Sequence, residues 1–385
     1  MPDSAPEFSL SLHRAIAEIP AVDWNACAGP DNPFVSHAFL SALEDSGSAN
    51  ARTGWLPQHA VLRDAAGRTV ACAPAYAKSH SQGEYVFDHG WANALESAGG
   101  SYYPKLQLCV PFSPVPGPRL LVRPGSGVPV ATLARGVVQA CGQLDLSSAH
   151  ITFCEAAEYE ALGKAGWLQR LGTQFHWENP GYTSFDDFLA ALNSRKRKAI
   201  KRERRDAAAS GFVLKTLRGH EITPKHWAAF HSFYRATTDK KWGRSAYLTP
   251  RFWPMLGDRL GDKVVLMVAE QDGTPVAGAL NLMGSQALYG RNWGAVVHAP
   301  FLHFELCYYR AIEFAIEHKL ARVEAGAQGE HKIQRGYLPK VTYSAHWIEH
   351  PGLRRAIDNF LKQERPALLA EMAALSELSP FRETE

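Results

Sequence analysis

The sequence predicts an α/β protein with mixed sheets, built from two tandem domains that repeat one structural unit. Its length of 385 residues is too great for one ordinary core, because a domain usually has about 100–200 residues. An apolar content of 46% beside 21% charged residues is that of a folded globular chain. The third observation is an internal repeat, which is clearest as a pair of strands in each half.

The repeated pair of strands is predicted to be a β-hairpin. It covers residues 59–64 and 69–76 in the first half and residues 264–270 and 275–281 in the second. In the second copy Asp272-Gly273 stands between the strands, and this dipeptide is typical of a two-residue hairpin turn.

Three other correspondences follow the same order in both halves. They pair residues 34–40 with 247–253, the third strands 87–92 with 289–294, and the last strands 175–177 with 345–347. Trp91 is thereby matched to Trp293, and His176 to His346. Several matches in one order indicate a duplication more strongly than any single match does.

A long helix is predicted after the antiparallel strands of the second half. It begins after Pro300, and its apolar face is formed by Phe304, Cys307, Tyr308, Ala311, Ile312 and Ala315. The strand 321–324 follows, so we expect a parallel crossover within a mixed sheet. A turn cluster at 179–181 divides the chain into a first domain of residues 1–180 and a second domain of residues 181–385.

A strongly basic helix is predicted from Leu192 to Gly211. We assign Arg195, Lys198 and Arg202 as contacts to the phosphates of a tRNA. The alternative is a helix face that is only solvated, which is the commoner role of a charge run.

These segments resemble the FemAB-like branch of the GNAT superfamily, in the bacterial group labelled peptidoglycan biosynthesis/recognition. The resemblance is carried by residues 192–211, 272–273 and 324–337, and in the first half by 88–91, 102–107 and 111–114. It implies two tandem GNAT-like domains packed together. It also implies transfer of an acyl group, often an aminoacyl group from aminoacyl-tRNA, onto an amine with formation of an amide bond.

Amide formation requires a neutral amine, a stabilised oxyanion and a held donor. The strand 321–324 leads into a glycine-rich turn, and such turns let the backbone approach a ligand. We assign catalytic roles to Glu330, His331 and Lys332 in this turn and to Glu305 on the long helix. Glu305 has the alternative role of an acid at a helix N-terminus.

Substrate binding is assigned to two groups of residues. In the second half they are Tyr289, Arg291, Asn292, Gln328, Arg335 and Tyr337, and in the first half Asp88, His89, Tyr102, Tyr103, Lys105 and Gln107. The first-half group also suits a domain interface, and the polar residues of 289–293 also suit an edge strand.

The donor is expected to be aminoacyl-tRNA, with no resident cofactor. Residues 295–301, before the long helix, lack the glycine pair with which a GNAT loop grips coenzyme A, and Pro300 removes a backbone donor. One alternative is an acetyl-coenzyme A-dependent N-acetyltransferase. Another is a non-catalytic protein that binds a cell-wall precursor or a peptide.

The remaining expectations concern location and partners. Six scattered cysteines without a C-x-x-C pair suggest a reduced, cytoplasmic protein and no metal site. No long apolar stretch or leader is evident, so we expect no membrane insertion. The expected acceptor is a small amine, an amino acid or a peptide.

Overall fold

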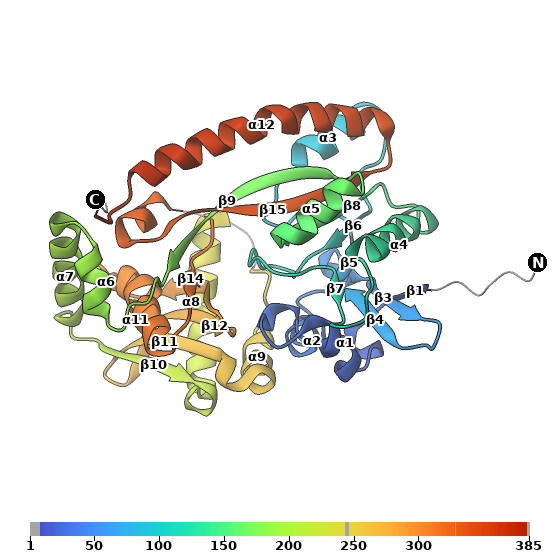
Figure 1. The fold of residues 1–385 in the computed structure, drawn as a ribbon. Helices are drawn as coiled ribbons and strands as arrows, with labels where there is room; N and C mark the ends of the chain where they lie inside the picture. The colour runs from blue at the N-terminus through green and yellow to red at the C-terminus, as the bar shows by residue number, and fades with distance from the viewer. Residues whose placement is uncertain (1–7, 243–245, 328, 383–385) are drawn as a thin grey trace, which may run out of the picture. The chain divides into compact units, whose positions relative to one another are not determined.

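The structure, a computed structural model, describes residues 8–242, 246–327 and 329–382. They form two compact units, and Figure 1 labels most of their elements. Unit 1 runs through Gly172 and also contains Val341–Leu369, while unit 2 consists of Thr173–Lys340 and the chain from Ala370. The chain passes between the units within β9 (Leu168–Glu178), β15 (Leu338–Ile348) and α12 (Pro351–Glu377).

Unit 1 contains two sheets. One has the order β1-β3-β4-β7, with β1 Phe8–His13, β3 His59–Asp64, β4 Thr69–Ala73 and β7 Leu121–Val122. In the other, the C-terminal part of β15 is followed by β8, β6, β5 and β2, which are Ser148–Cys154, Lys105–Leu108, Ala75–Lys78 and Trp55–Pro57. The predicted first hairpin is confirmed as β3 and β4, and after Pro74 the chain enters the second sheet as β5.

The helices of unit 1 other than α12 all bury apolar residues. They are α1 Ala21–Ala28, α2 His37–Asp45, α3 His89–Ser97, α4 Val130–Gln143 and α5 Ala156–Lys164. Leu133 and Val137 of α4 share a core with Leu106 of β6 and Ile151 of β8. Because β6 and β8 are parallel and α4 lies between them in the chain, they form a parallel crossover.

Unit 2 is built on one mixed sheet of order β10-β11-β12-β13-β14, continued by the C-terminal part of β9. The first five strands are Val213–Arg218, Val264–Gln271, Thr274–Met283, Ala287–Ala295 and Arg322–Glu324. The second predicted hairpin is confirmed as β11 and β12. Asp272 and Gly273 both have positive φ, of 50° and 72°, as their turn requires.

The helices of unit 2 confirm the predicted crossover and the predicted basic segment. They are α6 Phe185–Ala191, α7 Ser194–Ala208, α8 Pro224–Trp242, α9 Phe252–Leu260, α10 Leu302–Phe304 and α11 Arg310–Glu317. The π-helical turn η6 (Glu305–Tyr309) joins α10 to α11, so the long helix contains a local widening. This helix connects β13 to the parallel strand β14.

The last strand of each sequence repeat pairs in the unit that the other repeat mainly forms. His176 of β9 lies opposite Glu324 of β14 in unit 2, whereas His346 of β15 lies opposite His150 of β8 in unit 1. In each case the partner is the strand that follows the long helix of that unit. His176 and His346 therefore have equivalent positions, as the repeat predicts. The compact units therefore do not coincide with the sequence segments 1–180 and 181–385.

The predicted third strand 87–92 is wrong. His89–Ser97 form helix α3, in which Trp91 and Leu95 are buried on one face. The strand that corresponds to β13 is instead β6, since each pairs in parallel with the strand after the long helix. Trp91 is therefore not the counterpart of Trp293.

Among the described residues, no helix has the length and the apolar composition that crossing a bilayer requires.

Candidate active site

In unit 2 the strands β13 and β14 part at the level of Tyr289 and Glu324. Their parallel pairing starts at Ala287 and Arg322 and ends at this pair. On its other side β13 pairs with β12 through a bulge, because Leu280 faces Asn292 while Asn281 faces Gly290. Arg291 is the extra residue of this bulge, and a bulge redirects a side chain out of the regular alternation.

His331 lies in η7 (Glu330–Arg335), the short 3-10 helix that follows β14. The residue is exposed, and its Nε2 is 3.0 Å from the hydroxyl of Tyr308 in the π-helical turn. The ring of His303 lies 6.1 Å from that of His331 and 5.0 Å from that of Trp293 on β13. This aromatic cluster brings η7, the long helix and β13 together.

Gly329 permits this position of the His331 ring. Its φ is 102°, and a Cβ atom there would lie 2.4 Å from the His331 ring. Glycine alone combines such a backbone angle with the missing side chain. The predicted glycine-rich turn therefore has a definite steric purpose.

Lys332, Arg335 and Tyr337 point into the protein and hold the turn. The Lys332 ammonium donates to the carbonyls of Ala325 and Gly326. The guanidinium of Arg335 donates to both carboxylate oxygens of Glu203 on α7, at 3.0 and 2.9 Å. Since these side chains are buried, the structure places them as supports of the turn, whereas His331 is accessible.

The carboxylate of Glu305, one of the residues assigned a catalytic role, is paired with arginines. It accepts hydrogen bonds from Arg204 of α7 at 3.1 and 3.0 Å, and the side chain of Arg310 lies 3.6 Å away. Arg204 also donates to Glu313 of α11. The carboxylate therefore belongs to an ion-pair network that fastens α7 to the long helix.

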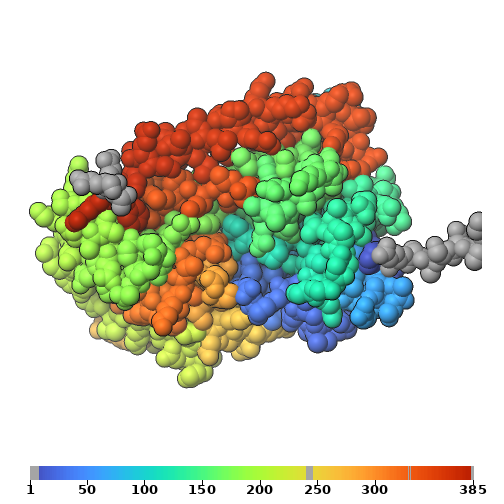
Figure 2. All heavy atoms as spheres, viewed as in Figure 1, coloured from blue at the N-terminus to red at the C-terminus, as the bar shows by residue number. Residues whose placement is uncertain are grey.

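The three assigned tRNA contacts lie on the exposed face of α7. Arg195, Lys198 and Arg202 are all exposed, while Ile200 and Ala207 are buried on the opposite side. Figure 2 shows this helix in light green at the surface of unit 2. Glu203 and Arg204 face inward, so the inner side of α7 is anchored and its outer side is cationic.

Two assigned residues of the turn lie wholly or partly outside the described part of the chain. Gln328 lies outside the described residues, and so does the side chain of Glu330. Asn292 is half-buried on β13 next to the bulge, and Tyr289 is buried where β13 and β14 part.

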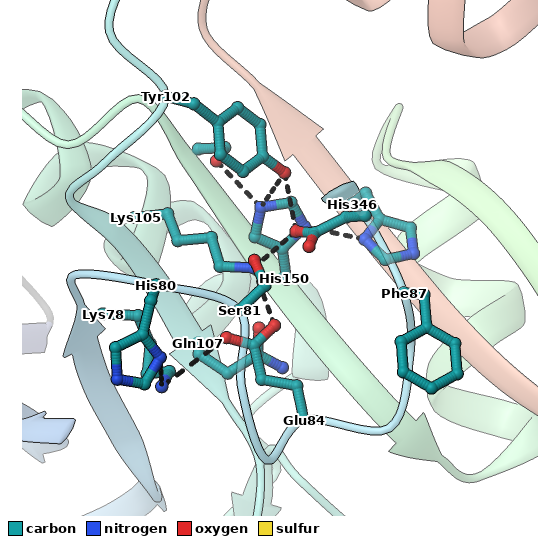
Figure 3. A network of polar contacts seen from close by, with 12 residues as sticks. Lys78, His80, Ser81, Glu84, Phe87, Tyr102, Lys105, Gln107, His150 and His346 are labelled. Carbon is teal, nitrogen blue, oxygen red and sulfur yellow. Dashed lines mark hydrogen bonds and ion pairs between the residues drawn. The ribbon is translucent and has the colours of Figure 1, made fainter. Parts of the chain in front are cut away.

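A second polar cluster lies in unit 1 (Figure 3). The Lys105 ammonium on β6 donates to Ser81 at 2.9 Å, to Glu84 at 2.7 Å and to Asp88. Asp88 also accepts from the hydroxyl of Tyr102 at 2.7 Å. Gln107, two residues after Lys105 on the same strand, donates to Thr152 at 2.9 Å.

The cluster continues across the sheet through two histidines. The Tyr102 hydroxyl lies 3.3 Å from Nε2 of His150, and Nδ1 of His150 is 2.8 Å from Nδ1 of His346. One of these two Nδ1 atoms must carry the proton that the other accepts. Burial lowers the pKa of His150 to about 3 and the pKa of His346 well below its usual value, so both rings are neutral.

The ionisable groups of the cluster are strongly perturbed. Burial lowers the pKa of Lys78 to about 7, because the Glu84 carboxylate at 3.8 Å compensates its charge only in part. Burial also raises the pKa of Glu84 to about 7, against the opposing charge of Lys105. For Asp88 burial acts in the same direction, yet the Lys105 charge prevails and holds its pKa below the usual value.

Of the six residues assigned in the first half, Asp88, Tyr102, Lys105 and Gln107 belong to this cluster and are buried. Tyr103 joins its edge through a 2.8 Å contact with Ser81. His89 is exposed and stacks on Phe87. Sequence reasoning missed Lys78, Glu84, His150 and His346; the alternation of polar and apolar residues in 148–154 was the available signal for His150.

Comparison with known proteins identifies the family. The model of the FemAB-like family, described as peptidoglycan biosynthesis/recognition, matches residues 15–383. A search of curated proteins found no match. Among solved structures, FemX has a TM-score of 0.54 at 10% identity, with 91% of this chain and 100% of FemX covered.

Two further solved structures have the same fold. The C-terminal domain of a protein described as a lysylphosphatidylglycerol synthetase, from Agrobacterium fabrum, has a TM-score of 0.54 at 10% identity and covers 91% of this chain and 97% of its own. A protein of unknown function from Bacteroides thetaiotaomicron has a TM-score of 0.54 at 8% identity, with coverages of 88% and 99%. At these identities the likeness concerns the fold. The chain belongs to the FemAB-like family and is an acyltransferase with two tandem GNAT-like domains.

Proposed function

We propose that this acyltransferase moves an aminoacyl group from an aminoacyl-tRNA to the amine of a small molecule, amino acid or peptide. The amine nitrogen attacks the ester carbonyl and forms the new C–N bond. The C–O bond to the tRNA breaks, the terminal ribose hydroxyl leaves with a proton, and the amine loses one. The chemistry is assigned to unit 2, at the end of β14.

The observation that carries this proposal is the link between α7 and the turn that holds His331. Arg335 of η7 is bound at two points by Glu203 of α7, while Arg195, Lys198 and Arg202 lie on the exposed side of the same helix. A polyanion on that outer face would be held by a helix that is fixed to the candidate reacting turn.

His331 is the group best placed to take the proton from the amine. Its ring is accessible, its orientation is set by Tyr308 and by the glycine at 329, and imidazole is the side chain that most often serves as a general base. The bulge at Arg291 offers a cationic side chain in the same unit for the oxyanion or the donor. Lys332 and Arg335 keep the turn in place.

A binding experiment tests the donor. The full chain is titrated with aminoacyl-tRNA at several salt concentrations, and the triple variant Arg195→Gln, Lys198→Gln, Arg202→Gln is compared with it. We expect weaker binding and a log–log salt slope that falls by about 0.7–0.9 for each phosphate the variant no longer neutralises. The matched control removes the same charge from exposed positions in unit 1, through Arg135→Gln, Lys164→Gln and Arg355→Gln.

The same material distinguishes the coenzyme A alternative. A ligand present at about 100 times its dissociation constant stabilises a protein by about 2.7 kcal/mol, so acetyl-coenzyme A and aminoacyl-tRNA are compared by thermal shift. If acetyl-coenzyme A alone stabilises the chain, and the salt slope of the α7 variant is unchanged, the tRNA-dependent reaction is rejected. The protein would then be assigned as an N-acetyltransferase.

A further inference from the structure

The second sheet of unit 1 carries a continuous row of buried polar side chains. In the strand register Lys78 of β5 faces Lys105 of β6, Gln107 faces His150 of β8, and His150 faces His346 of β15. Lys105 and Gln107 are two residues apart and therefore share one face of their strand. All five side chains are buried, and two ammonium groups directly opposite each other repel unless an anion lies between them.

The segment 79–88 supplies the anions. It has no helix or strand, and the side chains that it buries over the row are the polar ones of Ser81, Glu84 and Asp88. Its large apolar side chains, Tyr85 and Phe87, are 39% and 63% exposed. In Figure 3 Phe87 lies apart from the network that Glu84 joins. The segment contacts Lys105 through these two carboxylates and the Ser81 hydroxyl, and it contacts Lys78 through the Gln82 carbonyl at 3.2 Å and the His80 ring at 3.4 Å.

The pairing between the two carboxylates and the row leaves several buried polar atoms of the described residues without a hydrogen bond. One oxygen of Glu84, one oxygen of Asp88 and the side-chain oxygen of Gln107 are buried without any hydrogen bond to a described residue. Lys78 has its nearest carboxylate oxygen at 3.8 Å and rests on the ring of Trp55 at 3.6 Å. A buried polar atom without a partner is unfavourable, so a ligand that pairs these groups better can compete with the segment for the row.

We propose that the row Lys78, Lys105, Gln107 and His150 is a binding site for a small dicarboxylate, which segment 79–88 occupies with Glu84 and Asp88 when no ligand is present. Two carboxylates on one short ligand would take the places of these two side chains. The lysines then donate to the ligand, and Glu84 and Asp88 move into water. In this role Asp88 competes with the ligand, in contrast to the substrate-binding role expected from the sequence.

The site is independent of the reaction assigned to unit 2, since every residue of the row and of the segment belongs to unit 1. The rigid elements carry the cations and the irregular segment carries the anions. A site that opened by displacement of the segment would therefore be cationic, and this arrangement selects an anionic ligand. Both carboxylates contact the Lys105 ammonium, and Glu84 also lies 3.8 Å from Lys78, so two carboxylates close together, as on a compact dicarboxylate, match the row better than one.

The test is a calorimetric titration of the full chain with malonate and succinate, beside acetate and inorganic phosphate, at constant ionic strength. We expect both dicarboxylates to bind and acetate to bind at least about tenfold more weakly, since it can make only one of the two charge-assisted contacts. Hydrogen exchange, measured in the same samples, is expected to become faster in residues 79–88 when malonate is present.

Two variants make the proposal falsifiable, and each is close to isosteric with the native side chain. Glu84→Gln weakens the competitor, so the dicarboxylates should bind several-fold more tightly. Lys78→Met removes a ligand donor while keeping the contact with Trp55, so they should bind about tenfold more weakly. The control Glu44→Gln removes a carboxylate that pairs with His59 elsewhere in unit 1 and should change nothing.

Three results of the titrations would overturn the proposal. The first is that neither the native chain nor Glu84→Gln binds a dicarboxylate. The second is that Lys78→Met, Glu84→Gln and the control bind the dicarboxylates with equal affinity. The third is that phosphate binds and the dicarboxylates do not. Binding without faster exchange in 79–88 would also contradict it, because the ligand would then lie elsewhere.

Discussion

His331 and Lys332 are neighbours in the chain with opposite environments. The histidine is exposed and contacts Tyr308, whereas the lysine is buried and donates to the backbone at the end of β14. A side chain that is accessible can meet a substrate, while one that satisfies internal carbonyls contributes to the stability of the turn. The two residues therefore respond differently to substitution.

We predict that His331→Ala lowers kcat by about a hundredfold to ten-thousandfold, the usual contribution of a positioned general base, with little change in Tm. The measurement is single-turnover aminoacyl transfer together with thermal unfolding. Lys332→Met is the matched comparison and should lower the free energy of unfolding by about 1–3 kcal/mol. Full activity in His331→Ala would end its assignment as the base.

The buried histidines predict acid sensitivity. Burial lowers the pKa of His150 and His176 to about 3 and the pKa of His346 well below its usual value. The unfolded chain binds protons below about pH 6.5 while these rings stay neutral in the folded state. Their contribution to stability is therefore complete above pH 6.5 and is lost as the pH falls below it.

Each histidine can remove up to about 1.4 kcal/mol of stability per pH unit below 6.5. Urea unfolding between pH 7 and pH 5 should show this decline, and His176→Gln should make it less steep. His89 is exposed, so His89→Gln is the control and should leave the slope unchanged. An equal slope in both variants would contradict the assignment.

At the scale of elements, the sequence of α7 does not show which of its basic residues face the inside of the protein. Eight basic residues crowd the predicted segment, but only Arg204 turns inward to meet Glu305 and Glu313. The apolar contacts of Ile200 and Ala207 choose the inner face, and this choice leaves Arg195, Lys198 and Arg202 exposed.

We predict that Glu305→Gln lowers the free energy of unfolding by about 1–3 kcal/mol, since it leaves Arg204 and Arg310 without a buried counter-charge. Glu313→Gln removes the same charge from the other partner of Arg204, whose side chain is 36% exposed, and should change stability by less than about 1 kcal/mol. Chemical unfolding of both variants is the measurement; equal losses of stability would show that burial of Glu305 is unimportant.

At the scale of the whole molecule, the exchange of last strands joins the two repeats. β15 supplies the strand beside β8 in unit 1, and β9 supplies the strand beside β14 in unit 2. Each segment of the sequence thus lacks a strand that the other one carries.

We predict that the fragments 1–180 and 181–385 are poorly folded when each is produced alone. Each would expose an unpaired strand edge, at β8 or at β14. Mixing the fragments should restore the circular dichroism and the cooperative unfolding of the intact chain. Two independently stable fragments that do not associate would contradict this dependence.

Sequence patterns were sufficient for elements whose signals are local. The hairpin around Asp272-Gly273, the crossover helix after Pro300 and the basic helix depend on turn chemistry and periodicity, and all are confirmed. The segment 87–92 resembles a strand only because its aromatic residues match those of β13. Its backbone is helical from His89, and Trp91 is buried with Ile357 and Leu361 of α12.

The sequence by itself determined the family, the repeated α/β architecture and the turn in which His331 stands. Only the tertiary structure decided which polar residues of that turn are accessible and which are internal supports. It alone assembled Lys78, Lys105, Glu84, His150 and His346 into one cluster. These residues are distant in the chain and become neighbours only through strand pairing, and the burial that perturbs their pKa values is a property of the folded sheet.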